Sequence, residues 1–347
     1  MTQGFRLQIL SQPAFTRVGE TLLGSMWEEG QENYESFWLD PESPQRSRGE
    51  IFLLGWMDAD HPVARLALWK PSEGESLFFL YARDRFLPAE AVVEFLSEVK
   101  RFAREKGVNA LSGPMAFSTW HPYRFISRMG DTDFFAGEQR MPEEDCADFI
   151  RSGFSSIAEY QTTLVEDLAE SMRIGAAMGV EQGLGAINVE IFGKDRLPQI
   201  LPELHRLSCE IFKDNFAYSH LDFQEFLASL GKSKTEEATL IIAYIQEKPA
   251  GFTFSYAIGS YDPGNGKPAR ETAVLKTLGV HPDYRGLKAG RNLKLAYGLA
   301  YLTHNYWIEK GCGSILHAYM KTDNRSRFMA AHFGLPIRDY VLVRGEF

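Results

Sequence analysis

Cysteine is scarce in this sequence, and its scarcity removes several classes of site. Cys146, Cys209 and Cys312 are scattered, with no CxxC pair and no histidines at metal-ligand spacing from them. We therefore expect buried, reduced thiols rather than disulfides or zinc ligands. The sequence also contains no HExxH motif and no G-x-S-x-G nucleophile turn. Neither a metal site nor a covalent nucleophile is therefore predicted.

Long apolar runs and an excess of positive charge are absent as well. No apolar run approaches the roughly 18 residues of a membrane span, and the stretch MTQGFRLQILSQPAF lacks the segments of a signal peptide. The formal net charge is −9, from 37 Lys and Arg against 46 Asp and Glu, whereas general nucleic-acid binding needs a basic surface. We expect a cytoplasmic protein with no membrane or nucleic-acid partner. Nothing in the composition signals a particular oligomeric state.

What the sequence does contain is a repeat. KRFAREKGVNALSGPM (100–115) and THNYWIEKGCGSILHAYM (303–320) each predict a helix that ends in Glu-Lys-Gly, followed by a short strand that ends in Met. Gly107 and Gly311 suit the left-handed residue that ends a helix. Residues 146–165 and 324–343 then each predict a helix, a glycine and a strand carrying a tyrosine. The repeating unit is about 160 residues long, which indicates two related domains rather than a solenoid.

The two halves predict the same kind of fold. In the first half we expect strands at 5–10, 51–57, 63–69 and 76–82 and helices at 14–27 and 88–105; in the second, strands at 187–192, 239–246, 250–258 and 273–280 and helices at 197–212 and 222–230. Hairpin-linked strands followed by helix, strand, helix and strand make a mixed α/β sheet. The predicted domains are 1–165 and 187–347, joined by a linker at 166–186 that is rich in Gly and Ala.

The stretch VHPDYRGLKAGRNLKLAY (280–297) places two glycines and four cations where a strand is expected to lead into a helix. Amide groups at a helix start are unpaired and form a site for anions. Cations are unfavourable beside the positive end of the helix dipole unless an anion is bound. Arginine can hold phosphate through two hydrogen bonds. The pattern therefore predicts a phosphate site, and its simpler alternative is a solvated basic surface.

A family resemblance follows from these residues. A strand, Val280-x-Pro282 and Arg285-Gly286-x-x-x-Gly290 opening a helix resemble the acyl-CoA signature of the GCN5-related N-acetyltransferases, and NRSRFMAAHFG (324–334) resembles the family's next block. Residues 187–347 follow the family's element order, whereas the first half fits the fold but lacks the signature. The resemblance implies two tandem acyl-CoA N-acyltransferase-type domains, each a mixed, mostly antiparallel sheet flanked by helices, with a degenerate N-terminal half.

The resemblance also implies a reaction and a set of site residues. It implies acetyl-CoA or another acyl-CoA as co-substrate, without a metal, and direct acyl transfer to a primary amine of a small molecule. The residues implied for the acyl-CoA are Leu278, Gly279, Val280, Arg285, Gly286, Leu287, Lys288, Ala289, Gly290, Arg291 and Asn324. The family's middle glycine is Lys288 here, and its usual acid, a tyrosine, is replaced by Ala330 or Ala331.

Two other residues are the candidates for proton transfer. Tyr319, at the end of a strand, could reach the point where strands of this fold separate and serve as the acid, and Glu271 is the acid nearest to the family's base position, which holds Lys276 and Thr277. Two alternatives to a CoA-dependent enzyme stay open. One is a non-catalytic acyl-CoA-binding or regulatory protein, and the other is a transferase whose donor is an acyl carrier protein or aminoacyl-tRNA.

Overall fold

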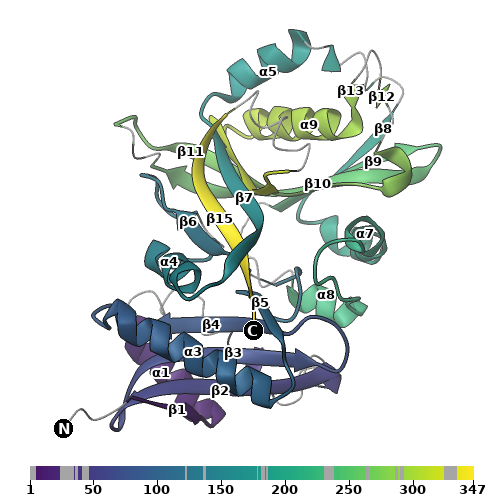
Figure 1. Ribbon diagram of the computed structural model, residues 1–347. Helices are drawn as coiled ribbons and strands as arrows, with labels where there is room; N and C mark the ends of the chain where they lie inside the picture. Colours follow the sequence, from purple (N-terminus) through teal and green to yellow (C-terminus); the bar gives the residue numbers. More distant parts are fainter. Residues whose placement is uncertain are drawn as a thin grey trace. The chain divides into compact units, whose positions relative to one another are not determined.

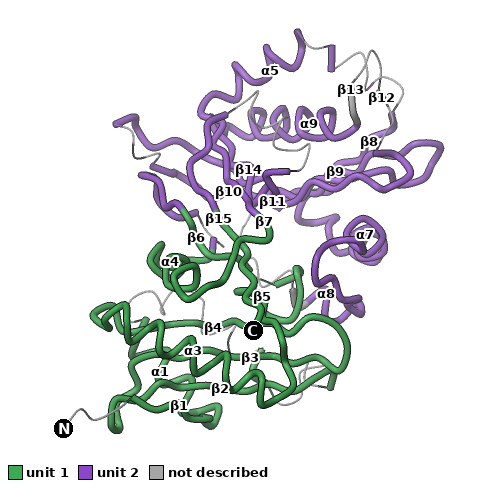
Figure 2. The backbone as a smooth tube through the Cα atoms, viewed as in Figure 1, with its two compact units in different colours: residues 1–127, 139–158, 340–347 green, residues 128–138, 159–339 purple. Residues whose placement is uncertain are grey.

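The structure is a computed structural model (Figure 1). It describes residues 5–23, 35, 38–40, 47–121, 123–135, 138–177, 179–180, 184, 187–229, 238–262, 264, 266–285, 288–289, 293–323 and 334–347. The chain divides into two compact units, coloured separately in Figure 2: residues 1–127, 139–158 and 340–347 form unit 1, and residues 128–138 and 159–339 form unit 2. No helix of the described residues is long and apolar enough to cross a membrane.

Unit 1 is a sheet with helices on both faces. Its strands are β1 (Arg6–Ile9), β2 (Gly49–Asp58), β3 (His61–Pro71), β4 (Leu77–Arg83), β5 (Ala110–Gly113) and the last part of β15 (Leu335–Glu346). Its helices are α1 (Gln12–Leu23), α3 (Ala89–Glu105) and α4 (Glu143–Arg151), and β6 (Phe125–Arg128) crosses the boundary of the units. Helix α3 buries apolar side chains at helical spacing, among them Val92, Phe95 and Val99, and is followed by Gly107, whose φ is 75°.

Unit 2 is built in the same way. Its strands are β8 (Asn188–Phe192), β9 (Ala238–Ile245), β10 (Lys248–Tyr261), β11 (Arg270–Val280), β14 (Ser314–Lys321) and most of β7 (Ser155–Val165). Its helices are α5 (Leu168–Ala177), α7 (Leu197–Phe212), α8 (Phe223–Ser229) and α9 (Leu295–Glu309), with a 3₁₀ turn, η3 (Pro282–Tyr284), and a small pair of strands, β12 (Lys288–Ala289) and β13 (Leu293–Lys294). Helices α9 and α7 lie on opposite faces of this sheet (Figure 1).

The strand order is the same in the two units, which confirms the tandem fold predicted from the repeat. The neighbours run β1-β2-β3-β4-β5 in unit 1 and β8-β9-β10-β11-β14 in unit 2. In both, the first four strands pair antiparallel and the fifth pairs parallel with the fourth. The fifth then pairs antiparallel with a sixth strand, β15 in unit 1 and β7 in unit 2.

The sixth strand of each unit comes from the other half of the sequence. Residues 160–165 of β7 pair with β14, and residues 343–346 of β15 pair with β5. The compact units therefore follow boundaries different from the predicted 1–165 and 187–347, because strand pairing assigns the ends of both segments to the opposite unit. The predicted linker, 166–186, contains helix α5, which contacts α9 within unit 2.

Helix α9 is largely covered and mostly apolar because unit 2 packs against it on two sides. Leu295, Leu299 and Trp307 are buried against the sheet, in clusters that include Ala243, Ala250 and Ala273. Tyr301 is buried on the other side of the helix, against the segment that contains α5. A surface helix carries an exposed polar face, and α9 lacks one, as expected for a helix buried between two layers.

Candidate functional site

Strands β11 and β14 of unit 2 separate partway along their length. They pair in parallel only from Thr272 with Ser314 to Leu275 with His317. Beyond this point β11 continues to Val280 along β10, while β14 continues to Lys321 along β7. Among the described residues, no strand pairs with the edge of Lys276–Val280 that faces β14. Backbone amide and carbonyl groups of this edge are therefore available to a ligand.

Both strands carry an irregularity at the point of separation. In the β10–β11 ladder Phe254 pairs with Thr277 and Ser255 with Leu275, so Lys276 is an extra residue. In the β14–β7 ladder the register shifts between His317 and Met320. Bulges bend a strand and increase its twist. The two bulges thus explain why the strands part, and we call the open region between Lys276–Val280 and Ala318–Lys321 the fork.

Tyr319 lies at this fork, as the sequence predicted, and Lys276 lies opposite it. The Lys276 ammonium is 4.1 Å from the centre of the Tyr319 ring, and both residues are half-buried. The Tyr319 ring also contacts Phe135, with ring centres 5.9 Å apart. Its backbone N–H donates to the Thr162 hydroxyl over 3.4 Å. The fork therefore contains one phenol and one ammonium in direct contact.

The face of the sheet beneath Tyr319 is apolar. Tyr319 packs against a buried cluster that includes Phe135, Tyr256, Leu316 and Ala318. Residues 128–138, which carry Phe135, come from the first half of the sequence but belong to unit 2. Arg338 holds them: its buried guanidinium donates to the Glu138 carboxylate over 2.6 Å and to the Thr132 carbonyl over 2.6 Å. One wall of the fork thus depends on a buried ion pair.

The far end of β11 is fastened to helix α7. Gly279 allows this approach, because a Cβ there would lie 3.1 Å from Ile211 Cγ2. The His281 ring contacts the Glu210 carboxylate at 3.0 Å. Arg285 is exposed, yet its guanidinium donates to the carbonyls of Ile211 at 2.8 Å and Val280 at 3.2 Å. The predicted phosphate-binding arginine is therefore also a structural bridge.

The start of the following helix corrects one prediction. We expected a helix to open at Arg285-Gly286-x-x-x-Gly290, but α9 begins at Leu295. Between them Lys288 pairs with Lys294 and Ala289 with Leu293 in a short antiparallel ladder. Gly286, Leu287, Gly290, Arg291 and Asn324 lie outside the described residues.

Glu271, the predicted base, is not brought to the fork. It lies at the start of β11, where this strand still runs beside β14, and accepts a hydrogen bond from Ser260 at 3.3 Å. Lys276 is five residues further along the strand, about 16 Å away. Lys276, by contrast, is at the fork, and the sequence does not single it out because a lysine is not the carboxylate expected of a base. The structure shows that Lys276 lies at a bulge. No pattern in the sequence marks this position.

A chain of buried polar groups lies under helix α9. The Ser171 hydroxyl donates to the Leu168 carbonyl over 2.8 Å and lies 2.9 Å from His304 Nδ1. His304 Nδ1 must then donate to Ser171, so His304 Nε2 accepts from His317 Nε2–H at 2.8 Å. This leaves His317 Nδ1 unprotonated, and no partner for it is found among the described residues. Burial lowers the pKa of His317 to about 4 and that of His304 well below its usual range.

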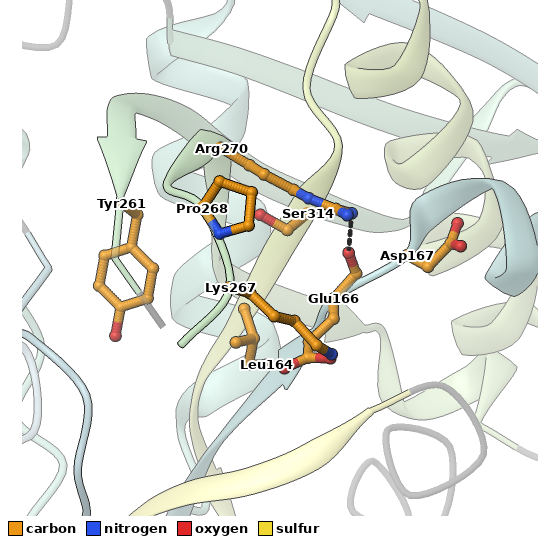
Figure 3. A pocket seen from close by; sticks show the side chains of 8 residues that line it. All are labelled: Leu164, Glu166, Asp167, Tyr261, Lys267, Pro268, Arg270 and Ser314. Atoms are coloured by element: carbon orange, nitrogen blue, oxygen red, sulfur yellow. Dashed lines mark hydrogen bonds and ion pairs between the residues drawn. The ribbon is translucent and has the colours of Figure 1, made fainter. Parts of the chain in front are cut away.

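A separate cavity of about 130 Å³ lies at the other end of β11 and β14 (Figure 3). Its lining includes Glu166, Lys267 and Arg270, which contact one another: Lys267 forms an ion pair with Glu166, and Arg270 donates to the Glu166 carbonyl over 3.0 Å. Lys267 and Arg270 are thus engaged in holding the segment after β7, and the fork is the better candidate site. The described residues hold no cluster of His, Cys, Asp or Glu suited to a metal.

The equivalent strands of unit 1 are packed differently. β4 also has a register shift, near Leu80, whose φ is 51°. The Phe78 carbonyl, however, accepts a hydrogen bond from the Met115 N–H, and the Phe78 ring stacks on Phe149 with centres 4.5 Å apart. The Phe125 ring also lies 4.9 Å from Phe149. Aromatic side chains therefore fill the region beside these strands, which accords with the lack of a phosphate signature in the first half.

Comparisons with known proteins agree with this geometry. The acetyltransferase (GNAT) family model matches residues 201–334. A solved tandem GNAT protein from the clavulanic acid biosynthesis pathway is similar over 99% of this chain and 98% of its own, with a TM-score of 0.53 at 12% identity.

Two further solved structures are similar. A GCN5-related N-acetyltransferase from Sphaerobacter thermophilus covers 99% of this chain and 95% of its own, with a TM-score of 0.50 at 10% identity. A GCN5-related N-acetyltransferase from Anabaena variabilis is similar over 98% of this chain and 72% of its own, with a TM-score of 0.55 at 7% identity. At these identities the likeness shows the fold. No curated protein matches the sequence.

Proposed function

The chain has the tandem GNAT fold, and its residues 201–334 match the acetyltransferase (GNAT) family; from this premise we propose that it transfers an acyl group from acetyl-CoA or another acyl-CoA to a primary amine of a small molecule. The observation that carries the proposal is the fork, where the open edge of Lys276–Val280 faces Tyr319. A thioester needs such an edge because backbone amides can polarise its carbonyl.

The proposed reaction is a direct transfer. The amine nitrogen attacks the thioester carbonyl carbon, a C–N bond forms and the C–S bond breaks. The nitrogen loses a proton to water, and the coenzyme A sulfur takes one from an acid. Tyr319 is the proposed source of this proton, because its phenol lies at the fork beside the open edge of β11. Glu271 has no part in this scheme, because it lies at the other end of the strand.

The phosphates of the acyl-CoA are proposed to lie beyond the C-terminal end of β11. Arg285 is a cation there, and the sequence from 286 to 291 carries the glycines and further cations of the signature. Leu278, Gly279 and Val280 would contact the pantetheine arm through their backbone. Unit 1 is not proposed to bind a second acyl-CoA, because aromatic packing fills its equivalent region.

Binding can be tested without knowing the acceptor. Coenzyme A at about a hundred times its dissociation constant should stabilise the protein by about 2.7 kcal/mol. Thermal unfolding with coenzyme A, acetyl-CoA and pantetheine measures this, and pantetheine should have the smallest effect because it lacks the diphosphate. If none of the three raises the melting temperature, the proposed co-substrate is wrong.

Catalysis is tested by thiol release from acetyl-CoA with a panel of primary amines. With an accepted amine, Tyr319→Phe should lower kcat by roughly 10²–10⁴-fold, the range for loss of a general acid, and leave coenzyme A binding unchanged. Tyr261→Phe is the matched control, because that hydroxyl donates to the Asp133 carbonyl on the same face of the sheet. Equal rates for Tyr319→Phe and the native protein would remove Tyr319 from the mechanism.

A second candidate function is acyl-CoA binding without catalysis. It is favoured by Lys288, which replaces the glycine that lets the family's backbone approach the pyrophosphate, and by the start of α9 at Leu295. The same two measurements distinguish the functions. A binding protein is stabilised by coenzyme A but releases no thiol with any amine.

A further inference from the structure

We propose that unit 2 binds a small molecule carrying a phosphate group in a cavity at the end of helix α9. The cavity has a volume of about 320 Å³, and its lining includes Lys194, Asp195, Arg196, Ala238, Tyr306 and Lys310. All of these residues belong to unit 2. The ligand is independent of the proposed acyl transfer, because it would bind in the absence of any acyl-CoA.

Two segments that are far apart in the sequence bring cations to this cavity. Lys194 and Arg196 lie in the turn that joins β8 to α7, and Lys310 directly follows the last residue of α9. The turn is closed by the N–H groups of Arg196 and Leu197, which donate to the Gly193 carbonyl at 3.0 and 2.9 Å. The backbone that carries the first two cations is therefore fixed by the fold.

Arg196 is held in place by its own side-chain contacts. Its guanidinium donates to the Ile191 carbonyl over 3.3 Å and lies 4.7 Å from the centre of the Phe192 ring. Its ion pair with the Glu190 carboxylate is long, at 3.5 Å, and both side chains are about half exposed. An exposed pair at this distance is weak, so Arg196 keeps most of its attraction for a second anion.

Lys194 and Lys310 have no carboxylate partner in the part of the chain that the structure describes. The Glu309 carboxylate, next to Lys310 in the sequence, accepts a hydrogen bond from the Asn305 amide at 2.8 Å. Asp195 is the acidic side chain of the lining. Three cations and one carboxylate therefore line the cavity, in a protein whose formal net charge is −9.

An excess of positive charge at a concave surface favours an anion. A cavity lined by one sign of charge concentrates its field and raises the local concentration of counter-ions. A phosphate monoester carries close to two negative charges at pH 7 and has three acceptor oxygens. Arginine can bind such a group through two parallel hydrogen bonds, and lysine binds it as a point charge. The excess of two positive charges in the described lining therefore matches one phosphate group.

The volume and the Tyr306 ring indicate that the ligand also has an organic body. Ligand cavities in proteins begin near about 300 Å³, and one water occupies about 30 Å³ of the liquid. A volume of about 320 Å³ thus exceeds what a bare phosphate ion needs. The half-buried Tyr306 ring meets Trp307 edge to face at 5.2 Å, and the Lys310 ammonium lies 5.7 Å from its centre. A fixed aromatic ring beside a cation suits a ligand with a cyclic part next to its phosphate.

The cavity is distinct from the place proposed for the phosphates of acyl-CoA. That place lies near Arg285, and the first residue of α9, Leu295, packs in a cluster with Tyr284 at this end. The cavity lies at the other end of the helix, beyond Glu309. The 15 residues of α9 span about 22 Å, so both sites can be occupied at once.

The experiment compares two ligands of similar shape and different charge. Phenyl phosphate carries close to two negative charges at pH 7.5, because the second pKa of a phosphate monoester is near 6, whereas benzenesulfonate carries one. Isothermal titration calorimetry of the native protein, without coenzyme A and at fixed ionic strength, gives Kd for each. We expect phenyl phosphate to bind about tenfold more tightly. Ribose 5-phosphate should also bind, and ribose should not.

Variants with effects of opposite sign identify the cavity. Lys194→Met and Lys310→Met should each weaken phenyl phosphate binding by about three- to tenfold, the effect of one charge-assisted contact at an exposed site. Asp195→Asn should strengthen it by about two- to fivefold, because a like charge is removed. A gain of affinity cannot result from a loss of structure. Lys248→Met is the control, because Lys248 is exposed and lies at the other end of β9 from Ala238.

A titration in the presence of coenzyme A separates this cavity from the acyl-CoA site. Phenyl phosphate should keep its Kd when coenzyme A is present, and it should also keep it in Arg285→Ala. Binding that coenzyme A abolishes would place the ligand at the acyl-CoA site and overturn the proposal. A protein that binds phenyl phosphate as expected but is not stabilised by coenzyme A would refute the proposed co-substrate alone.

Three further results would also overturn the phosphate site. These are equal affinities for phenyl phosphate and benzenesulfonate, a Kd that is unchanged in both Lys194→Met and Lys310→Met, and no binding of either phosphate ester. Tighter binding of inorganic phosphate than of both esters would show a site for the bare anion and refute the organic ligand.

Discussion

Tyr319 has a backbone φ of 56°, a conformation that a tyrosine adopts rarely. Tyr319 adopts this conformation within the bulge of β14. Its side chain packs against the cluster that contains Ala318 and Phe135. Strained residues are often found where a structure must present a side chain to a ligand. At the residue scale, the fork is thus defined by two bulge positions, Lys276 and Tyr319, that face each other.

Arg285 illustrates how a predicted ligand contact can be a structural one as well. From the sequence we expect Arg285→Ala to weaken coenzyme A binding by roughly tenfold to a hundredfold without lowering the stability of the free protein. The structure changes the second expectation, because the guanidinium donates to the Ile211 and Val280 carbonyls.

We now expect Arg285→Ala to lose about 1 kcal/mol, discounted for the exposure of the residue, which lowers the melting temperature by about 2–4 °C. Thermal unfolding with and without coenzyme A measures both effects on one variant. Arg206→Ala is the control, since Arg206 is exposed and pairs with Glu210 at the surface. An unchanged melting temperature would show that the two hydrogen bonds contribute nothing.

Three buried histidines predict how stability depends on pH. Burial lowers the pKa of His121 and of His317 to about 4 and that of His304 well below its usual value. Below the ordinary value of about 6.5 the unfolded chain takes up protons that the folded protein excludes, so stability falls as the pH falls from 6.5 toward 4. For His317 alone the loss is on the order of 3 kcal/mol.

Urea unfolding at a series of pH values between 7.5 and 4.5 measures this slope. His317→Asn should flatten the curve although it lowers stability at neutral pH, because one titrating group has been removed. His61→Asn is the control, since His61 is exposed on β3. A profile that is the same in native protein and His317→Asn would contradict the assignment.

At the scale of elements, helix α5 shows why the Gly- and Ala-rich segment is not an open linker. Gly175 is buried, and a Cβ there would lie 2.5 Å from Tyr301 Cδ2 of α9. Alanine is the better helix former by about 1 kcal/mol, so an isolated helix would gain from Gly175→Ala. The close approach of α9 reverses the expected sign.

We therefore expect Gly175→Ala to destabilise unit 2 by about 1–3 kcal/mol, the range for overpacking. A double-mutant cycle with Tyr301→Leu, followed by chemical denaturation, tests the cause. The second substitution should recover most of the loss by making room for the methyl group. If Gly175→Ala stabilises the protein, α5 and α9 do not approach as closely as the structure shows.

At the scale of the whole molecule, the exchange of sixth strands makes the halves of the sequence interdependent. A fragment of residues 187–347 lacks β7, whose Leu164 and Val165 are buried beside β14. A fragment of residues 1–165 lacks the end of β15, whose Leu342 and Val343 are fully buried. Each fragment would leave a long strand edge unpaired, which favours aggregation.

We expect each fragment to be insoluble when expressed alone and the two to give soluble protein when expressed together. Solubility and circular dichroism of the fragments check this. A fragment of 187–347 that folds alone and binds coenzyme A would show that β7 is dispensable for unit 2.

Local sequence patterns determined the positions of most elements. The strands and helices predicted between residues 187 and 280 agree with β8, α7, α8, β9, β10 and β11 to within a few residues, because alternation and helical spacing are local properties. Gly107 and Gly311 end their helices with positive φ, as their chemistry requires. The resemblance to the acetyltransferase (GNAT) family likewise rests on local sequence, and the family model matches residues 201–334.

The tertiary structure decided what depends on distant pairing. Whether β7 pairs with β5 or with β14 is invisible in its sequence, since both pairings bury the same apolar face. The extra residue at Lys276 arises from the register between β10 and β11, and the start of α9 at Leu295 from a ladder that competes with the helix. Register and partner choice depend on the whole sheet, and for that reason the contact between Lys276 and Tyr319 could be found only in the folded protein.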